Sequence, residues 1–252
     1  MIHVVTPFHN AAPYLRGCLD SLLRQDVQEW QCWLYDDAST DGSVETIRPT
    51  LVDSRFHLTT NPSQRGLTWN YSCFRQNAQV QDEDLVISLD GDDQLAGNQA
   101  LRTVCTFYRE FPQLWLTWGS YLCVDARGRT RPGISRSVAD VTLVRNKPWR
   151  TSHLRTCKAF LLRAIREEDL LDQQGNYYSP AGDMALMFPM LEMATNQHAL
   201  HIPSYLYYYH EDNPHSDHRL HGAEQRANER WLRSRPPYQP YASADVDHHS
   251  RI

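Results

Sequence analysis

Residues 84–93 read Asp-Leu-Val-Ile-Ser-Leu-Asp-Gly-Asp-Asp, an apolar run that ends in a cluster of carboxylates. The apolar half predicts a buried β-strand, because it is short and is followed at once by turn residues. Asp90, Asp92 and Asp93 repel one another, so a folded chain tolerates them best beside a cation or hydrogen-bond donors. Gly91 lets the backbone turn tightly and lets a ligand approach closely. The segment therefore predicts a strand that ends at an acidic ligand site.

The chain before this segment alternates short apolar runs with helical patterns. Three further strands are predicted at residues 2–6, 30–35 and 55–60. Helices are predicted after Asn10, which is a candidate cap, from near Ser43, and at residues 66–80. Strands and helices that alternate at these intervals form right-handed βαβ units. The expected fold class is therefore α/β, with a mainly parallel, Rossmann-like central sheet flanked by helices.

Three turn segments follow the predicted parallel strands: Thr6–Asn10, Asp36–Asp41 and Asp90–Asp93. Ligands of open α/β sheets bind at the carboxyl ends of the strands, so these segments are expected to meet at one edge. The alternative for the last segment is a solvated acidic turn, with Asp93 favoured by the dipole of a following helix. Its position directly after an apolar strand favours the ligand site.

The second half of the chain has a less regular pattern. Strands are predicted within residues 114–126 and at 198–202 and 205–210, and helices at 155–166 and 183–194. From Arg235 onward the chain lacks periodicity and is rich in proline, which predicts a disordered tail over residues 235–252.

Composition excludes several classes of protein. The net charge of −5 and the scattered basic residues argue against a nucleic-acid partner, whose binding needs clustered Lys and Arg. Six widely spaced cysteines without a CxxC pair indicate reduced thiols rather than a disulfide or zinc framework. No run approaches the ~20 apolar residues of a transmembrane segment. The expected location is cytoplasmic, with peripheral membrane association also allowed.

Three motifs together point to a known family. They are Thr6-Pro7-Phe8-His9-Asn10, Tyr35-Asp36-Asp37-Ala38-Ser39-Thr40-Asp41-Gly42-Ser43 and Leu89-Asp90-Gly91-Asp92-Asp93, in this order. The set resembles the nucleotide-sugar-binding half of family 2 glycosyltransferases, which have the GT-A fold. The resemblance implies that residues 1–120 form the donor-binding half. Residues 121–234 would then form a smaller acceptor-side region of the same domain, which carries the catalytic base.

The resemblance also assigns contacts with the nucleotide sugar. Thr6 and Pro7 would contact the nucleoside through their backbone, and Asp37 would accept a hydrogen bond from the base. Asp90 matches the residue near the ribose, and Gly91 replaces the small residue that usually follows it. A further contact is expected from Arg65, either with the base or with the diphosphate; the alternative is a surface charge.

A divalent cation, Mn²⁺ or Mg²⁺, is the cofactor that the resemblance implies. Asp92 matches the metal ligand of the family, and carboxylate oxygens suit such hard cations. His210, in a Tyr-His stretch similar to one that binds the metal in some relatives, is the candidate second ligand. A solvated histidine is the alternative. Other histidines lie nearby in the sequence: His201, His215, His218 and His221.

Asp183 is the candidate catalytic base. In inverting members of the family an aspartate that opens a late helix, often within Glu-Asp, deprotonates the acceptor hydroxyl. Asp183 matches this aspartate, whereas Gly182 stands where glutamate is common. The alternative is a helix N-cap, for which aspartate is a favoured residue. His153 is expected near the acceptor side from its order along the chain.

The function implied by the resemblance is an inverting sugar transfer from a nucleoside-diphosphate sugar to a hydroxyl of a glycan or lipid-linked glycan, as in polysaccharide biosynthesis. A uridine-diphosphate donor is favoured, because Asp37 suits uracil; guanine and thymine donors, which occur in similar folds, are the alternatives. The alternative is a nucleotide-sugar-binding or glycan-assembly scaffold protein without activity. A sugar nucleotidyltransferase is disfavoured, because residues 6–10 lack a glycine-rich basic loop.

Overall fold

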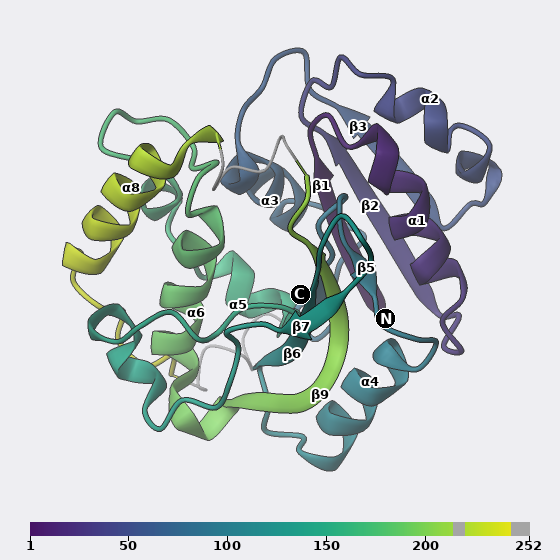
Figure 1. Cartoon of the computed structure of the whole chain (residues 1–252). Helices are drawn as coiled ribbons and strands as arrows, with labels where there is room; N and C mark the ends of the chain where they lie inside the picture. The colour runs from purple at the N-terminus through teal and green to yellow at the C-terminus, as the bar shows by residue number, and fades with distance from the viewer. Residues whose placement is uncertain (214–219, 243–252) are drawn as a thin grey trace.

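The computed structural model describes residues 1–213 and 220–242 (Figure 1). Within these ranges nine strands form one sheet, in the order β3-β2-β1-β4-β8-β6-β9-β5, with β7 paired to β6. The strands are β1 Ile2–Phe8, β2 Trp30–Asp36, β3 Phe56–Thr60, β4 Leu85–Ser88, β5 Gln94–Leu95, β6 Leu116–Val124, β7 Thr130–Pro132, β8 Arg155–Lys158 and β9 Ala199–His210.

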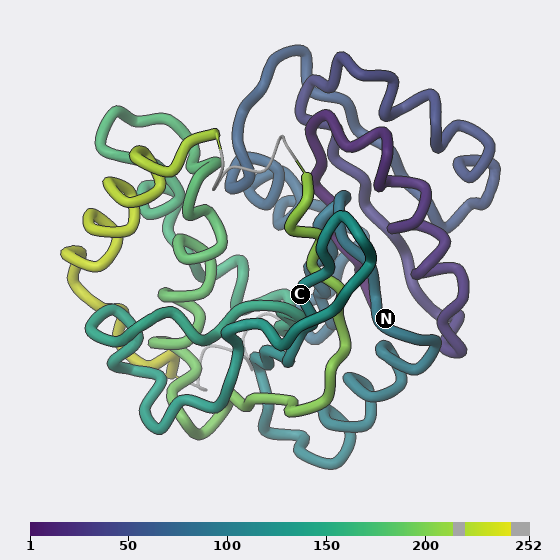
Figure 2. The backbone as a smooth tube through the Cα atoms, in the orientation of Figure 1, coloured from purple at the N-terminus to yellow at the C-terminus, as the bar shows by residue number. Residues whose placement is uncertain are grey.

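Helices cover both faces of this sheet (Figure 2). The helices are α1 Ala12–Leu23, α2 Ser43–Ile47, α3 Leu67–Arg75, α4 Ala100–Glu110, α5 Ala159–Arg163, α6 Gly182–His198 and α8 Gly222–Ser234, with 3₁₀ turns η1 Thr50–Val52, η2 Val141–Asn146 and η3 Glu167–Leu170. Neighbouring residues of β1 point to opposite faces: Val4 packs in one core with α1 and α4, and Val5 in the other with α3, α5 and α6. Burial on both faces explains why the first strands are apolar without alternation.

The first four strands are parallel, as the sequence predicts. β1 lies between β2 and β4, with Val4 opposite Cys32 on one side and Ile87 on the other, and β3 pairs with the outer edge of β2. The second half adds antiparallel pairings, because β8 runs antiparallel to both β4 and β6. The sheet is therefore parallel where the three acidic or turn-rich segments meet and mixed beyond that point.

Three predictions about helices differ from the structure. The predicted helix at 155–166 begins as strand β8, because Thr156 pairs with strands on both sides, and only Ala159–Arg163 is helical. The helix predicted at 66–80 ends at Arg75. Helix α1 is capped by Ala11 without a side-chain hydrogen bond, and Asn10 has a left-handed backbone.

The predicted disordered tail is wrong for residues 235–242. Tyr238 donates its hydroxyl proton to Asp169 Oδ2 at 2.6 Å, and its backbone N–H donates to Glu192 Oε2 at 2.9 Å. The backbone N–H of Tyr241 donates to the carbonyl of Met193. These contacts provide the hydrogen-bond partners and the burial that the local pattern does not reveal. Residues 243–252 lie outside the described residues.

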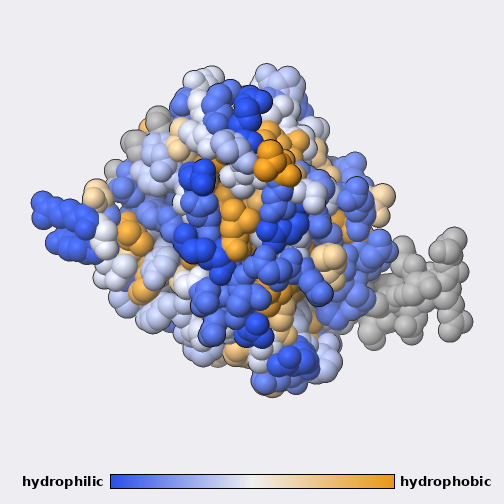
Figure 3. All heavy atoms as spheres, turned by 90° about the vertical axis from the view of Figure 1, so that its right-hand side faces the viewer, coloured by the Kyte–Doolittle hydropathy of each residue, from blue (hydrophilic) through white to orange (hydrophobic). Residues whose placement is uncertain are grey.

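All six cysteines are free, which agrees with the prediction of reduced thiols. Among the described residues, no helix has both the length and the apolar character needed to cross a membrane. The face of the molecule on the right of Figure 1 is mostly hydrophilic, with smaller apolar areas between polar side chains (Figure 3).

Candidate functional site

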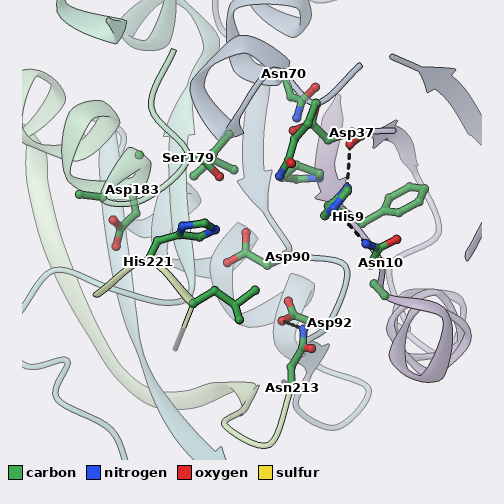
Figure 4. A pocket seen from close by; sticks show the side chains of 18 of the residues that line it. His9, Asn10, Asp37, Asn70, Asp90, Asp92, Ser179, Asp183, Asn213 and His221 are labelled. Carbon is green, nitrogen blue, oxygen red and sulfur yellow. Dashed lines mark hydrogen bonds between the residues drawn. The ribbon is translucent and has the colours of Figure 1, made fainter. Parts of the chain in front are cut away.

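A cleft of about 430 Å³ opens at the carboxyl ends of β1, β2 and β4. Five of the residues expected in the site line it together: Pro7, Asp37, Asp90, Asp92 and Asp183. Figure 4 shows Asp37 on one wall, Asp183 on the opposite wall and Asp90 between them. The other expected residues, Thr6, Arg65, Gly91 and His210, are not among the described residues that line the cleft.

Short backbone contacts join the three strand ends. The N–H of Asp37 donates to the carbonyl of Phe8, and the N–H of Gly91 donates to the carbonyl of Pro7. A Cβ on Gly91 would lie 2.5 Å from the Cβ of Phe8, so only glycine fits there. Thr6 is fully buried, with Oγ1 3.7 Å from the sulfur of Cys32. The glycine thus serves the close approach of two loops.

Asp37 anchors a neighbouring loop while it lines the cleft. Its Oδ1 accepts hydrogen bonds from Asn61 Nδ2 and the backbone N–H of Arg65, both at 2.8 Å, and its Oδ2 accepts one from Gly66 N at 2.9 Å. A carboxylate offers about four acceptor positions, so Oδ2 retains room for a ligand donor. The guanidinium of Arg65 instead stacks over the Trp69 ring, 4.4 Å from its centroid.

His9 and Asn10 form part of the same wall (Figure 4). Asn10 Oδ1 accepts a hydrogen bond from Thr40 N, so its amide group donates to His9 Nε2 at 3.0 Å. Since Nε2 accepts, the ring carries its proton on Nδ1, which donates to the carbonyl of Asp37 at 2.8 Å. Both ring nitrogens of His9 therefore have a hydrogen-bond partner. The sequence analysis considered Asn10 only as a candidate helix cap and indicated no role for His9.

The carboxylates of the acidic turn have separate surroundings. Asp90 faces the cleft and accepts a hydrogen bond from Arg155 Nη2 at 2.9 Å. Asp93 is fully buried, and its Oδ1 accepts from the backbone N–H of His210. Burial is the main cause that raises the pKa of Asp93, and the negative charge of Asp92 is the next. The alternative interpretation, in which the dipole of a following helix favours Asp93, is wrong, because the next helix starts at Ala100.

Asp183 stands at the start of α6 without acting as its N-cap. The N-cap is Ala181, in a left-handed conformation, and Asp183 Oδ1 accepts from the N–H of Met184. A Cβ on Gly182 would meet Leu67 of α3 at 2.9–3.0 Å. This packing explains why glycine replaces the glutamate that the family resemblance leads one to expect. Burial raises the pKa of Asp183, and the charge of Arg155 partly offsets that shift.

The sequence analysis missed Arg155, which is only 6% exposed. It lies on β8, where its backbone is paired with Ser88 on one side and Trp118 on the other. Besides its bond to Asp90, its Nη1 lies 3.6 Å from Asp183 Oδ2. No local signal could have found it, because the residue lies in a segment whose pattern predicts a helix.

Several groups around the acidic turn could hold a cation. Ligand atoms of Asp90, Asp93 and His153 lie within 4.8 Å of one another. Asp93 Oδ2 and the Nδ1 atoms of His153 and His210 are buried without a hydrogen-bond partner among the described residues. Asp92 lines the cleft and accepts a hydrogen bond from Asn213. Oxygen-rich donors with unpaired buried atoms fit a hard divalent cation.

The candidate histidines differ in position. Nδ1 of His210 lies 3.9 Å from Asp93 Oδ1, and burial lowers the pKa of its ring. His153 stacks on Tyr207, with ring centroids 4.6 Å apart, and burial lowers its pKa well below the usual value. His221 lines the cleft, whereas the ring of His201 bonds to two serines. His215 and His218 lie outside the described residues.

Comparisons with known proteins agree with this geometry. Residues 3–169 match the model of the family described as glycosyl transferase family 2. The protein named "uncharacterized glycosyltransferase" of Haemophilus influenzae is 32% identical over 129 residues, 51% of this chain and 50% of that protein. The chain thus spans about half the length of this relative.

Solved structures of glycosyltransferases share the fold. TarS 1–349 of S. aureus, in complex with UDP-GlcNAc, superposes with a TM-score of 0.60 at 18% identity, over 84% of this chain and 59% of that chain. The mannosyltransferase PcManGT of Pyrobaculum calidifontis, in complex with GDP-Man and Mn²⁺, gives 0.60 at 16% identity, over 94% and 65%. The expected GT-A fold is confirmed.

Proposed function

Since this chain belongs to glycosyl transferase family 2, we propose that it transfers a sugar from a nucleoside-diphosphate sugar to an acceptor hydroxyl, with inversion at the anomeric carbon. The observation that carries the proposal is the single cleft that brings Asp37, Asp90 and Asp92 opposite Asp183 (Figure 4). The proposed nucleotide-binding groups and the proposed carboxylate base thus face the same space. A reaction between the two bound substrates needs this arrangement.

The proposed donor is a uridine-diphosphate sugar. Asp37 lines the cleft with an acceptor position left on Oδ2, which suits the N–H of uracil. Pro7 and His9 form the wall beside it. Among proteins of the same fold, TarS was solved with UDP-GlcNAc and PcManGT with GDP-Man. Use of a guanosine-diphosphate sugar by this chain would therefore correct the proposed identity of the donor.

A divalent cation is proposed to bind at Asp92. The histidine ligand is proposed to be His210, and His153 is the second histidine beside the acidic turn. When bound, Mn²⁺ or Mg²⁺ would neutralise negative charge on the diphosphate of the donor. The remaining chemistry falls to side chains of this chain.

Asp183 is proposed to remove the proton from the acceptor hydroxyl. Its side chain is 27% exposed and faces the cleft, so a bound hydroxyl can reach it. As a carboxylate it is a weak base, and proton transfer follows the development of positive charge on the attacking oxygen. The acceptor would be a glycan or lipid-linked glycan, as expected from the family resemblance.

Substitution of Asp183 by Asn tests this proposal. The expected result is a loss of acceptor-dependent release of nucleoside diphosphate by about 10²-fold or more, with UDP affinity unchanged within about threefold. Release would be measured with Mn²⁺ and a panel of donors and acceptors, and affinity by calorimetry. Retained transfer would refute the base assignment. A wild-type chain that binds UDP-sugars but never releases UDP would favour the scaffold alternative.

A further inference from the structure

Arg155 is the one residue on β8 that reaches both the donor side and the base side of the cleft. Its Nη2 bonds to both oxygens of Asp90, at 2.9 and 3.3 Å, and its Nη1 lies 3.6 Å from Asp183 Oδ2. Asp90 follows β4 and Asp183 opens α6, so one guanidinium connects two elements that are otherwise separate in the chain. Few side chains can do this, because a planar fork of donors is needed to bond in two directions.

We propose that Arg155 is a positioning residue, which fixes the orientation of Asp90 toward the donor and aligns Asp183 as the base. The inference rests on the proposed function of Asp183. It adds a residue that acts through two carboxylates rather than on the substrate. The two partners are 24% and 27% exposed, whereas Arg155, which lines the same cleft, is only 6% exposed.

The surroundings of Arg155 make it rigid and permanently charged. Its backbone is paired on both sides within the sheet, opposite Ser88 and Trp118. Asp90 is held as well, because its N–H donates to the hydroxyl of Tyr207 at 3.1 Å. Burial lowers the pKa of Arg155, but the charges of the two carboxylates raise this pKa by more than burial lowers it. The net shift of the pKa is therefore upward. The guanidinium therefore provides a fixed positive charge at every usable pH.

The effect on Asp183 depends on all charged groups that face it. Arg155 lowers its pKa, and Asp90 raises it. His153 and His221 line the same cleft, and burial holds the pKa of His153 well below its usual value. An opposite charge at this distance commonly shifts a carboxyl pKa by about 1–3 units. Without Arg155, Asp183 would be protonated over a wider range of pH and would lose activity there.

The test compares Arg155→Met and Arg155→Lys with Arg145→Met. Arg145 is equally buried, but its partner Glu192 is not among the residues that line the cleft, so this control loses a buried ion pair elsewhere. Each variant is measured for UDP binding, melting temperature and the pH dependence of kcat/KM for transfer. A structural role alone would lower the melting temperature of both Met variants without moving the pH profile.

For Arg155→Met we expect the acidic limb of kcat/KM to move upward by about one pH unit or more, with weaker UDP binding. In Arg155→Lys the limb should return toward that of the wild type, because the charge remains. Its kcat should stay about tenfold low, because one ammonium cannot bond both carboxylates as the fork does.

If Arg155→Met folds, an unchanged acidic limb of its pH profile would overturn the inference alone. If Arg155→Met does not fold, an Arg155→Lys variant with an unchanged acidic limb and full kcat would overturn it. Absence of transfer by the wild-type chain with every donor would overturn the proposed function and the inference together. The two failures are therefore distinguishable by the wild-type assay.

Discussion

Substitution of Asp37 by Asn removes a charge from the base of the loop at residues 61–66 while it keeps the shape of the side chain. Asp37 is 4% exposed and accepts hydrogen bonds from Asn61, Arg65 and Gly66. An amide presents one oxygen and one NH₂ group, so at least one of these donors would face another donor. With the amide nitrogen at the Oδ2 position, the N–H of Gly66 loses its acceptor.

The cost can be summed from these contacts. A buried backbone N–H without an acceptor costs about 1–3 kcal/mol. The two bonds that remain change from charged to neutral acceptors, and this change costs about 1 kcal/mol each. Because partial relaxation and water reduce such sums, we expect the free energy of unfolding to fall by about 3 kcal/mol. This is a large part of the ~5–15 kcal/mol of a typical domain.

The assay is urea denaturation with and without UDP. Asp53→Asn is the matched control, because Asp53 bonds to Arg55 at a partly exposed turn and should cost less than about 1 kcal/mol. UDP should bind more weakly to Asp37→Asn, since the loop that it anchors borders the cleft. A loss of stability below about 1 kcal/mol would refute the anchoring role. If Asp37→Asn lost UDP binding but kept full stability, a direct contact with the ligand would be the only role left for Asp37.

Three further outcomes are expected. Gly182→Glu should lower the free energy of unfolding by about 1–3 kcal/mol, because the Cβ of the new side chain meets Leu67. The second substitution Leu67→Ala in the same chain should restore part of this stability, as measured by denaturation. Tyr238→Phe should cost about 1 kcal/mol, since the bond to Asp169 is lost; an unchanged melting curve would contradict the packing of residues 235–242. In the wild type, kcat/KM should fall as pH drops through the pKa of Asp183, which burial raises, because the base must be ionised. A flat profile down to pH 4 would contradict that assignment.

The sequence alone determined the first half of the fold and half of the site. Short apolar runs that alternate with amphipathic helices predict parallel strands, and parallel strands bring their carboxyl ends to one edge. For this reason the order of the motifs along the chain is enough to predict that Pro7, Asp37, Asp90 and Asp92 share one cleft, and they do. Asp183 required the family resemblance, because an aspartate at a helix start is as common a cap as a base.

Only the tertiary structure decided what surrounds these carboxylates. Arg155 lies in a segment whose local pattern predicts a helix, and it becomes a strand because β4 and β6 both pair with it. Gly182 is explained by Leu67, and the buried Asp93 by the backbone of His210, more than a hundred residues away. Such contacts depend on which elements pack together. Local periodicity determines the elements themselves, but it contains no information about their neighbours in space.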